Sequence, residues 1–197
     1  GEQSSVTDYN MNAYSAEWTD EQNVIGASNR GGAYMADTKG NLTQIAELQE
    51  EQLLTIHKMQ GKIYYITTES TFQLYMLDLL TKEKKNLQLE NAYEIIHSPD
   101  GKQIVVTQII GATGAEKRLI IADADGTIQR TIAEGSEVTG ASWSPNQQMI
   151  AYQLDSVING EDSSGLYLYD VSTGKSIQIA DVVSAKIKWS PSGKKIS

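Results

Sequence analysis

The sequence predicts an all-β protein, a β-propeller with about four and a half four-stranded antiparallel blades. Three observations predict it: a turn motif that recurs along the chain, an aspartate that recurs in step with it, and strand-like runs between the two. Both landmarks return every 39 to 47 residues, and propeller blades repeat about every 40–50 residues. We therefore expect a single propeller domain over residues 1–197. Its blades are expected at about 9–46, 53–89, 92–133 and 137–181, with a partial blade at 184–197.

The first landmark is a turn that begins at an aromatic residue. A Trp-Ser-Pro turn begins at Trp143 and recurs at Trp189, and a third copy has His97 in the Trp position. Weaker copies begin at Trp18 and near His57. Proline presets φ at the second position of a turn, so the motif predicts a tight connection between two strands.

The second landmark is an aspartate that closes an apolar run in each copy. It stands at Asp37, Asp78, Asp123 and Asp170. Chance matching of one short motif is plausible, but two series that drift together indicate a structural repeat. Because this residue recurs in every blade, we expect it to maintain the fold and not to act in catalysis.

The clearest copy gives the order of elements within one blade. Alternating aliphatic and aromatic residues predict strands with two packed faces, and glycine at a turn supplies a positive φ. The four strands are expected at 138–143, 149–153, 166–170 and 176–180, with a polar loop at 159–165. Second and third strands of the other copies are expected at 23–27 and 33–37, 63–67 and 73–78, 104–107 and 119–123.

Residues 45–59 conflict with this assignment. They contain strong helix formers and neither Gly nor Pro, so in isolation they favour a helix. The repeat makes them the end of one blade and the first strand of the next. A short surface helix is the alternative.

These motifs resemble the blade repeat of TolB-like propellers, a WD40-like repeat family. The resemblance is carried by the Trp-Ser-Pro-Asp-Gly-Lys type of turn, the Ile-Ala-Tyr strand at 150–152, the Leu-Tyr-Leu-Tyr-Asp strand at 166–170 and the Thr-Gly turn at 173–174. It covers the chain from about Tyr14, and it is strongest in the last three copies. The same repeat occurs in the propellers of prolyl-oligopeptidase-like enzymes, so it identifies a repeat family with several functions.

The resemblance implies a ring, since TolB-like propellers usually have six or more blades. Four and a half blades therefore predict either further blades downstream or an open arc. An open arc would expose strand edges and apolar faces, which favour pairing with another copy.

Charge and composition exclude several classes of function. The net charge is −9, which opposes binding to nucleic acid or to an anionic membrane surface. Cysteine is absent, which excludes disulfides, zinc–thiolate sites and thiol catalysis. No apolar run approaches the roughly 18 residues that span a bilayer, so we expect no direct membrane insertion.

Two loops resemble parts of known binding motifs. Asp123, Asp125 and Gly126 suggest a calcium loop, but the further acids of that motif are replaced by Ile121 and Ile132, so a hairpin turn is favoured. The glycine-containing segment 111–117 lacks the Gly-Lys-Ser/Thr ending of a phosphate loop. We expect it to be a flexible loop between strands two and three.

The remaining candidates also favour structural roles. His57 and His97 are the only histidines, and both occupy or nearly occupy the Trp position of the repeat. Neither a Gly-x-Ser-x-Gly elbow nor a His-Glu-x-x-His motif occurs. Carboxylates from different blades could pair, but the sequence cannot align them. We therefore assign no catalytic, cofactor-binding or metal-binding residue, and expect no cofactor and no enzyme activity.

The leading functional hypothesis follows from the resemblance. It implies a non-enzymatic scaffold that binds a protein or peptide partner in the bacterial cell envelope. The location is expected to be extracytoplasmic, periplasmic or cell-surface, with any export signal or lipid anchor upstream of Gly1; a cytoplasmic location stays open. Two alternatives remain: a carbohydrate-binding or carbohydrate-processing propeller, and the propeller module of a larger peptidase or sensor.

Overall fold

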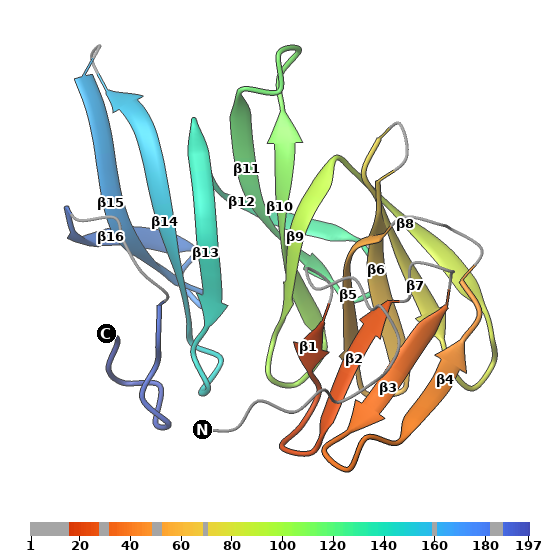
Figure 1. Ribbon diagram of the computed structural model, residues 1–197. Coiled ribbons are helices and arrows are strands. Elements are labelled where there is room, and N and C mark those ends of the chain that lie inside the picture. Colours follow the sequence, from red (N-terminus) through yellow and green to blue (C-terminus); the bar gives the residue numbers. More distant parts are fainter. Residues whose placement is uncertain (1–15, 28–31, 49–52, 69–70, 159–160, 182–186) are drawn as a thin grey trace. The chain divides into compact units, whose positions relative to one another are not determined.

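The computed structural model describes residues 16–27, 32–48, 53–68, 71–158, 161–181 and 187–197, and these form strands, turns and short connections (Figure 1). The strands make four four-stranded antiparallel sheets, each in sequential order, which confirms the all-β propeller architecture. The described residues contain no helix, and hence none long and apolar enough to cross a membrane. The sheets fall into two compact units, residues 1–90 and 91–197.

The first unit holds two sheets. The first consists of β1 (Glu17–Trp18), β2 (Asn23–Ala27), β3 (Ala33–Asp37) and β4 (Leu42–Ala46). The second consists of β5 (Leu53–Met59), β6 (Lys62–Thr67), β7 (Gln73–Asp78) and β8 (Lys84–Glu90).

The second unit holds the other two sheets and a hairpin. The third sheet consists of β9 (Ala92–His97), β10 (Gln103–Ile110), β11 (Glu116–Asp123) and β12 (Ile128–Gly135). The fourth consists of β13 (Glu137–Trp143), β14 (Met149–Ile158), β15 (Glu161–Asp170) and β16 (Lys175–Ala180). After it, Trp189 and Ile196 form an isolated antiparallel bridge across a turn, as expected for the opening of a further repeat.

Each sheet is a meander whose third strand ends at the recurring aspartate. Asp37, Asp78, Asp123 and Asp170 are the last residues of β3, β7, β11 and β15, so this landmark is confirmed in every copy. The second strands are the most deeply buried: all residues of β6 after Lys62 are buried on both faces. Strands of this kind have to be covered by further layers on both sides.

A buried serine hydroxyl holds the turn between the first and second strands. Ser144 Oγ donates to Asn146 Oδ1 over 2.7 Å and accepts the Met149 N–H over 2.9 Å. Ser98 makes the two equivalent bonds at 2.7 and 3.0 Å. Both serines are at most 1% exposed. The hydroxyl therefore binds the first residue of the second strand and sets its register.

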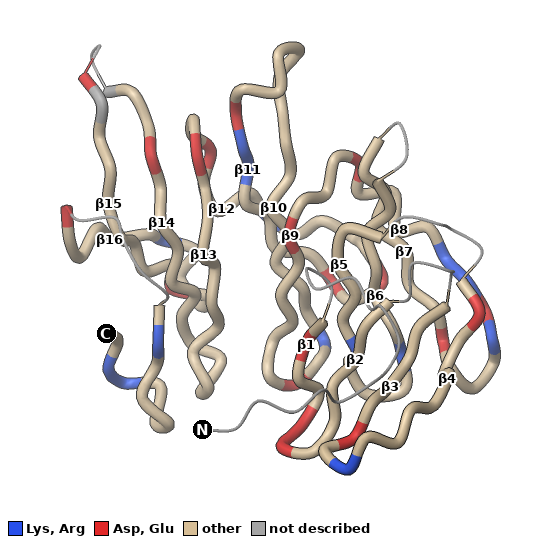
Figure 2. Tube along the Cα trace, viewed as in Figure 1, with Lys and Arg blue, Asp and Glu red and all other residues tan. Residues whose placement is uncertain are grey.

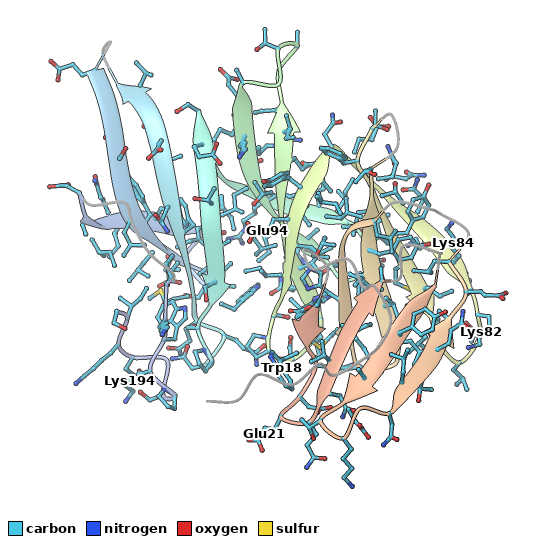
Figure 3. All side chains as sticks on the ribbon, viewed as in Figure 1. Trp18, Glu21, Lys82, Lys84, Glu94 and Lys194 are labelled. Carbon is cyan, nitrogen blue, oxygen red and sulfur yellow. The ribbon has the colours of Figure 1, made fainter. Side chains whose placement is uncertain are left out.

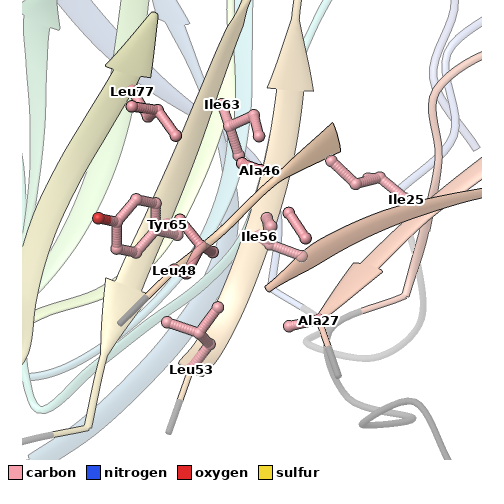
Figure 4. Packing of buried hydrophobic residues seen from close by; sticks show 10 residues of the cluster. Ile25, Ala27, Ala46, Leu48, Leu53, Ile56, Ile63, Tyr65 and Leu77 are labelled. Atoms are coloured by element: carbon pink, nitrogen blue, oxygen red, sulfur yellow. The ribbon is translucent and has the colours of Figure 1, made fainter. Parts of the chain in front are cut away.

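Apolar side chains fill the space between neighbouring sheets in each unit. Figure 4 shows the cluster of the first unit, where β2 contributes Ile25, β5 contributes Ile56 and β6 contributes Ile63, all fully buried. In the second unit Val105 and Leu119 of the third sheet pack with Trp143 and Tyr152 of the fourth. The two clusters show the same mode of packing, sheet face on sheet face.

The segment that favours a helix in isolation is extended in its described parts. Ile45 and Ala46 end β4, and Leu53–Met59 is β5. Residues 49–52 lie outside the described residues. Burial explains the outcome, because Leu53 and Ile56 enter the first unit's apolar cluster as strand residues, and tertiary packing overrides local helix propensity.

The prediction of a polar loop at 159–165 is wrong for residues 161–165, which belong to β15. β15 already begins at Glu161, and its register pairs Ser163 with Ser156 and Gly165 with Leu154. The loop can include only residues 159 and 160, which lie outside the described residues. The ladder uses backbone groups, so a polar run can extend a hairpin once its strands are aligned.

Truncation of a core leucine should destabilise the protein far more than truncation of an exposed leucine in the adjoining turn. Leu77 is 8% exposed and belongs to the apolar cluster, whereas Leu80, in the next turn, is 90% exposed. We expect Leu77→Ala to lower the free energy of unfolding by about 2–4 kcal/mol, and Leu80→Ala to change it by less than about 0.5 kcal/mol. Urea titration followed by circular dichroism measures both, and equal losses would contradict the packing.

Candidate functional site

The two loops that resemble binding motifs are parts of the blades. Asp125 Oδ1 accepts the Thr127 N–H over 3.1 Å, and Gly126 has φ +96°, which confirms the hairpin turn expected there. In the segment 111–117, residues 111–115 form the turn between β10 and β11, while Glu116 and Lys117 already belong to β11. Within the described ranges no group of three or more His, Asp or Glu could hold a metal ion.

The recurring aspartates organise the turn after the third strand. Asp78 Oδ1 accepts the N–H groups of Leu80 and Thr81, both at 2.9 Å. Asp170 Oδ1 likewise accepts two N–H groups, at 2.8 and 2.9 Å. These are Asx-turn contacts, in which a carboxylate replaces a backbone acceptor. With the same kind of contact from Lys39 and Asn41 to Asp37, they confirm the structural role expected of this residue at Asp37, Asp78 and Asp170.

The same contacts shift the titration of these carboxylates. A hydrogen bond from the Ser172 hydroxyl, followed by backbone N–H groups, lowers the pKa of Asp170. The backbone N–H groups of Thr81 and Leu80 lower the pKa of Asp78, and the Asn41 amide lowers that of Asp37. Each bond favours the ionised form, which is the acceptor.

The two histidines belong to different units and have different surroundings. Nδ1 of His57 on β5 contacts a carboxylate oxygen of Glu17 on β1, and Nε2 lies 2.8 Å from Thr55 Oγ1. This arrangement suits an imidazole that donates to Glu17 and accepts the Thr55 hydroxyl proton. It links the first strands of two sheets in the first unit. His97 is half-buried at the end of β9, opposite Ile104.

Four tyrosines form two stacked pairs inside the blades. Tyr65 stacks on Tyr75 and Tyr152 stacks on Tyr167, each with ring centroids 5.5 Å apart. Both pairs are opposite residues on the second and third strands, so they are cross-strand pairs that stabilise the sheet. Burial raises the pKa of Tyr65 and of Tyr152. These rings are packed against one another and are not open platforms for a ligand.

A different group of side chains lies at one end of the second unit, where Tyr93, Glu116 and Glu134 are exposed and the other members are partly buried. The strand register places the start of β9, the β10–β11 turn, the connection from β12 to β13 and the β14–β15 hairpin at this end. We call it the loop-end surface. It comprises Tyr93, Glu94, Glu116, Lys117, Glu134, Glu137 and Asp155.

Tyr93 and Lys117 form the centre of the loop-end surface. The Tyr93 side chain is 43% exposed, and Lys117 Nζ lies 4.8 Å from the centroid of its ring. The same ammonium group forms an ion pair with Glu137. A cation over the face of a tyrosine ring fixes the ring's orientation, so Tyr93 presents an oriented aromatic edge and hydroxyl to solvent.

Carboxylates surround this centre. Five acids stand on the loop-end surface against one base, and Figure 2 shows acidic residues in red on β11, β13 and β14. One oxygen of Asp155 is buried with no hydrogen-bond partner among the described residues, so it is not an acceptor open to a partner. The surface therefore offers acceptors and negative charge around an aromatic residue, a composition that suits a cationic or donor-rich partner.

The connection between β12 and β13 has no room for a larger residue. A Cβ at Gly135 would lie 2.3 Å from the Asp155 carbonyl oxygen. The Ser136 hydroxyl donates to that same oxygen over 3.1 Å. The close contact at Gly135 and the Ser136 hydrogen bond fix the connection between the third and fourth sheets against β14. Glu134 and Glu137, on either side of this connection, are therefore held on the loop-end surface.

Sequence reasoning did not identify the loop-end surface. Its residues come from four separate segments, and no motif marks them. The only sequence signal is the acidic connection between two predicted blades, with Glu134 and Glu137 on either side of Gly135. Glu17 as partner of His57 was also missed, because the two residues are far apart in sequence and meet only through sheet packing.

Neither family models nor curated proteins match this sequence. Solved structures do match it. TolB from Acinetobacter baumannii superposes with a TM-score of 0.65 at 18% identity, over 92% of this chain and 47% of that one. Dipeptidyl peptidase 4 from Porphyromonas gingivalis gives 0.67 at 11% identity, over 96% and 36%. An oligogalacturonate lyase in complex with manganese gives 0.65 at 15% identity, over 93% and 57%.

These matches show a TolB-like β-propeller fold. At such identities they show the fold alone. The chain spans 47% of the length of the TolB structure and 36% of the length of the peptidase. The proteins that share this fold have different activities by name, so the fold does not assign one.

The lowered pKa values of Asp37, Asp78 and Asp170 should make the fold sensitive to acid. A carboxylate whose pKa is lowered on folding stabilises the protein above its unfolded pKa of about 3.9, and this contribution is lost as the pH falls through the folded value. We expect Asp170→Asn to reduce the difference in unfolding midpoint between pH 7 and pH 3. Asp181→Asn is the control, because Asp181 accepts from the exposed Gln178 side chain. Urea titration at both pH values measures this, and identical pH dependence in both variants and the parent would contradict the assignment.

Proposed function

We propose that this chain is a non-enzymatic β-propeller scaffold that binds a protein or peptide partner in the bacterial cell envelope. The loop-end surface of the second unit is the proposed contact. The observation that supports this most is the exposed Tyr93, held by Lys117 and surrounded by carboxylates. Exposed aromatic residues with a polar rim are typical of protein interfaces.

The charge of the loop-end surface indicates which class of partner it would bind. Its acids exceed its bases, so the preferred partner is a segment that carries Lys or Arg. Such a partner would pair with Glu116 and Glu134, which are exposed, while the ring of Tyr93 packs on an apolar or cationic side chain. Loops on a rigid sheet scaffold are common positions for such contacts.

The envelope location rests on the resemblance to TolB-like repeats. A chain that carries this surface in an extracytoplasmic compartment would meet envelope proteins directly. Fractionation of cells expressing the chain from its own gene, with its natural upstream sequence, tests the location. Recovery in the cytoplasmic fraction would contradict it.

Two alternatives have specific support and separate tests. The match to an oligogalacturonate lyase supports a carbohydrate-processing propeller, and the match to a dipeptidyl peptidase supports a propeller module of a larger enzyme. Binding or cleavage of acidic oligosaccharides would favour the first. A Gly-x-Ser-x-Gly motif in the adjoining coding sequence would favour the second.

Binding of basic peptides should depend on the loop-end surface. We expect an array of 12-residue peptides to show preference for those with Lys or Arg, with an affinity that falls as salt rises. Tyr93→Ser combined with Glu116→Gln and Glu134→Gln should weaken the best peptide about tenfold, which corresponds to about 1.4 kcal/mol.

The control for this experiment is Glu83→Gln. Glu83 is exposed and belongs to the first unit, so the change removes one charge that is not part of the loop-end surface. Binding should be unchanged. Equal binding by the triple variant and the parent, or retention of glycans alone on a parallel array, would overturn the proposal.

A further inference from the structure

A lysine takes the place of a glycine in one of the four turns that follow the recurring aspartates. In the other three turns the residue with a left-handed backbone is glycine, with φ of 86°, 96° and 69° at Gly40, Gly126 and Gly174. In the second sheet this residue is Lys82, with φ 62°. Its N–H donates to the Asp78 carbonyl over 2.9 Å, as that of Gly174 donates to the Asp170 carbonyl over 2.8 Å. A Cβ is disfavoured in this conformation, so the turn itself does not account for a lysine.

Lys82 lines a hollow between the first and second sheets. The hollow has a volume of about 460 Å³ and is lined by Gln44, Ile45, Ala46, Glu47, Leu77 and Lys82. These residues come from β4 and the position after it, from β7, and from the turn between β7 and β8. Figure 3 labels Lys82 at the edge of the first unit. Small-molecule sites have volumes of roughly 300–1,000 Å³, so this hollow, which we call the Lys82 hollow, is large enough for a ligand.

The buried part of the lining is apolar. Leu77 and Ala46 are 8% and 9% exposed and belong to the apolar cluster of the first unit, and Ile45 packs against that cluster. Figure 4 shows Leu77 and Ala46 among the side chains of the cluster. The hollow therefore opens onto the edge of the core, where an apolar part of a ligand would be removed from water.

The exposed part of the lining is polar and carries one charge of each sign. Glu47 and Lys82 are both exposed, and neither forms an ion pair with another described residue. Gln44 adds a side-chain amide: its Nε2 donates to the Ala46 carbonyl over 3.5 Å, and its oxygen can accept a further hydrogen bond. Glu47 follows the first sheet and Lys82 belongs to the second, so the two charges are carried by different sheets.

We propose that the Lys82 hollow binds a dipeptide with apolar side chains and two free ends. The ammonium group of the ligand pairs with Glu47 and its carboxylate pairs with Lys82, because these are the two charges of the lining. Its side chains lie on Leu77 and Ile45 and remove apolar surface from water. Its peptide N–H donates to the side-chain oxygen of Gln44.

The two charges select a dipeptide over a fatty acid or an amine. A ligand with one charge would pair with only one of the two charged side chains. A ligand that reaches both sheets needs opposite charges at its two ends and an apolar part between them. The Lys82 hollow belongs to the first unit and shares no residue with the loop-end surface, so it is a small-molecule site in addition to the proposed scaffold function.

Isothermal titration calorimetry of the full chain with four matched probes tests the proposal. Leucyl-leucine has both charges and two apolar side chains, and its Kd should be on the order of 0.1–1 mM, which usual ligand efficiencies give for a molecule of this size. N-acetyl-leucyl-leucine lacks the ammonium group and leucyl-leucinamide lacks the carboxylate. Each should bind about three- to fivefold more weakly, the effect of one exposed ion pair. Glycyl-glycine should bind at least about tenfold more weakly, because it buries no apolar side chain.

Lys82→Gly separates a binding role from a structural role. Glycine is the residue of the equivalent turns, so this variant should unfold at the same urea concentration as the parent or at a higher one. It should bind leucyl-leucine about three- to fivefold more weakly and should no longer distinguish it from leucyl-leucinamide. Lys82→Gln keeps a long side chain without the charge and should show the same loss. Glu47→Gln should no longer distinguish leucyl-leucine from its N-acetyl form.

Lys39→Gln is the matched control. Lys39 is exposed in the equivalent turn of the first sheet and does not line the hollow, so this variant should bind all four probes as the parent does. The proposal would be overturned by a parent that does not bind leucyl-leucine at up to about 10 mM, well above the expected Kd. Equal affinity for the four probes would also overturn it, as would Lys82 variants that keep the parent's preference for a free carboxylate.

Discussion

The apolar faces of each sheet constrain this structure most strongly. In β6 Tyr64 and Tyr65 point to opposite faces, and both are buried. A sheet with two apolar faces cannot be stable as a single layer, so each sheet requires a neighbour. Within each unit the neighbour is the next repeat in the sequence. The same constraint makes the uncovered Trp18 notable, because it is the one motif Trp of the described chain that lies mainly in solvent.

Hydrogen bonds in the turns set the register of the strands, and this register brings the apolar faces of neighbouring sheets together. Ser98 and Ser144 bind the start of the second strand, and Asp78 and Asp170 close the third. Because these polar groups recur at fixed places, the apolar residues of the two copies within each unit meet. Charged side chains are left at the strand ends and in the connections, and the loop-end surface lies there.

Much of the fold could be predicted from the sequence because each blade repeats the same local chemistry. The turn motif and the recurring aspartate are short-range signals, and their spacing was enough to place β2, β3 and β7 at the residues where they occur. The β14–β15 hairpin was predicted too short, because polar residues in an aligned ladder look like a loop in sequence.

The functional surfaces could not be predicted in the same way. The pairing of Glu17 with His57, and the grouping of Tyr93 with Lys117 and Glu137, depend on which strand ends meet. Those contacts break the repeat, so the motif that predicts the fold carries no information about them. The exposure of Trp18 likewise follows from its neighbours and not from its own motif.

The most direct test of this account compares the three tryptophans of the repeat. Labelling with 5-fluorotryptophan gives one fluorine signal for each of Trp18, Trp143 and Trp189, assigned by single Trp→Phe variants. With a soluble paramagnetic agent in dilute protein, the account predicts the strongest broadening for Trp18, less for Trp189 and least for Trp143. Equal protection of Trp18 and Trp143 would contradict the claim that the same motif residue is buried only where another blade covers it.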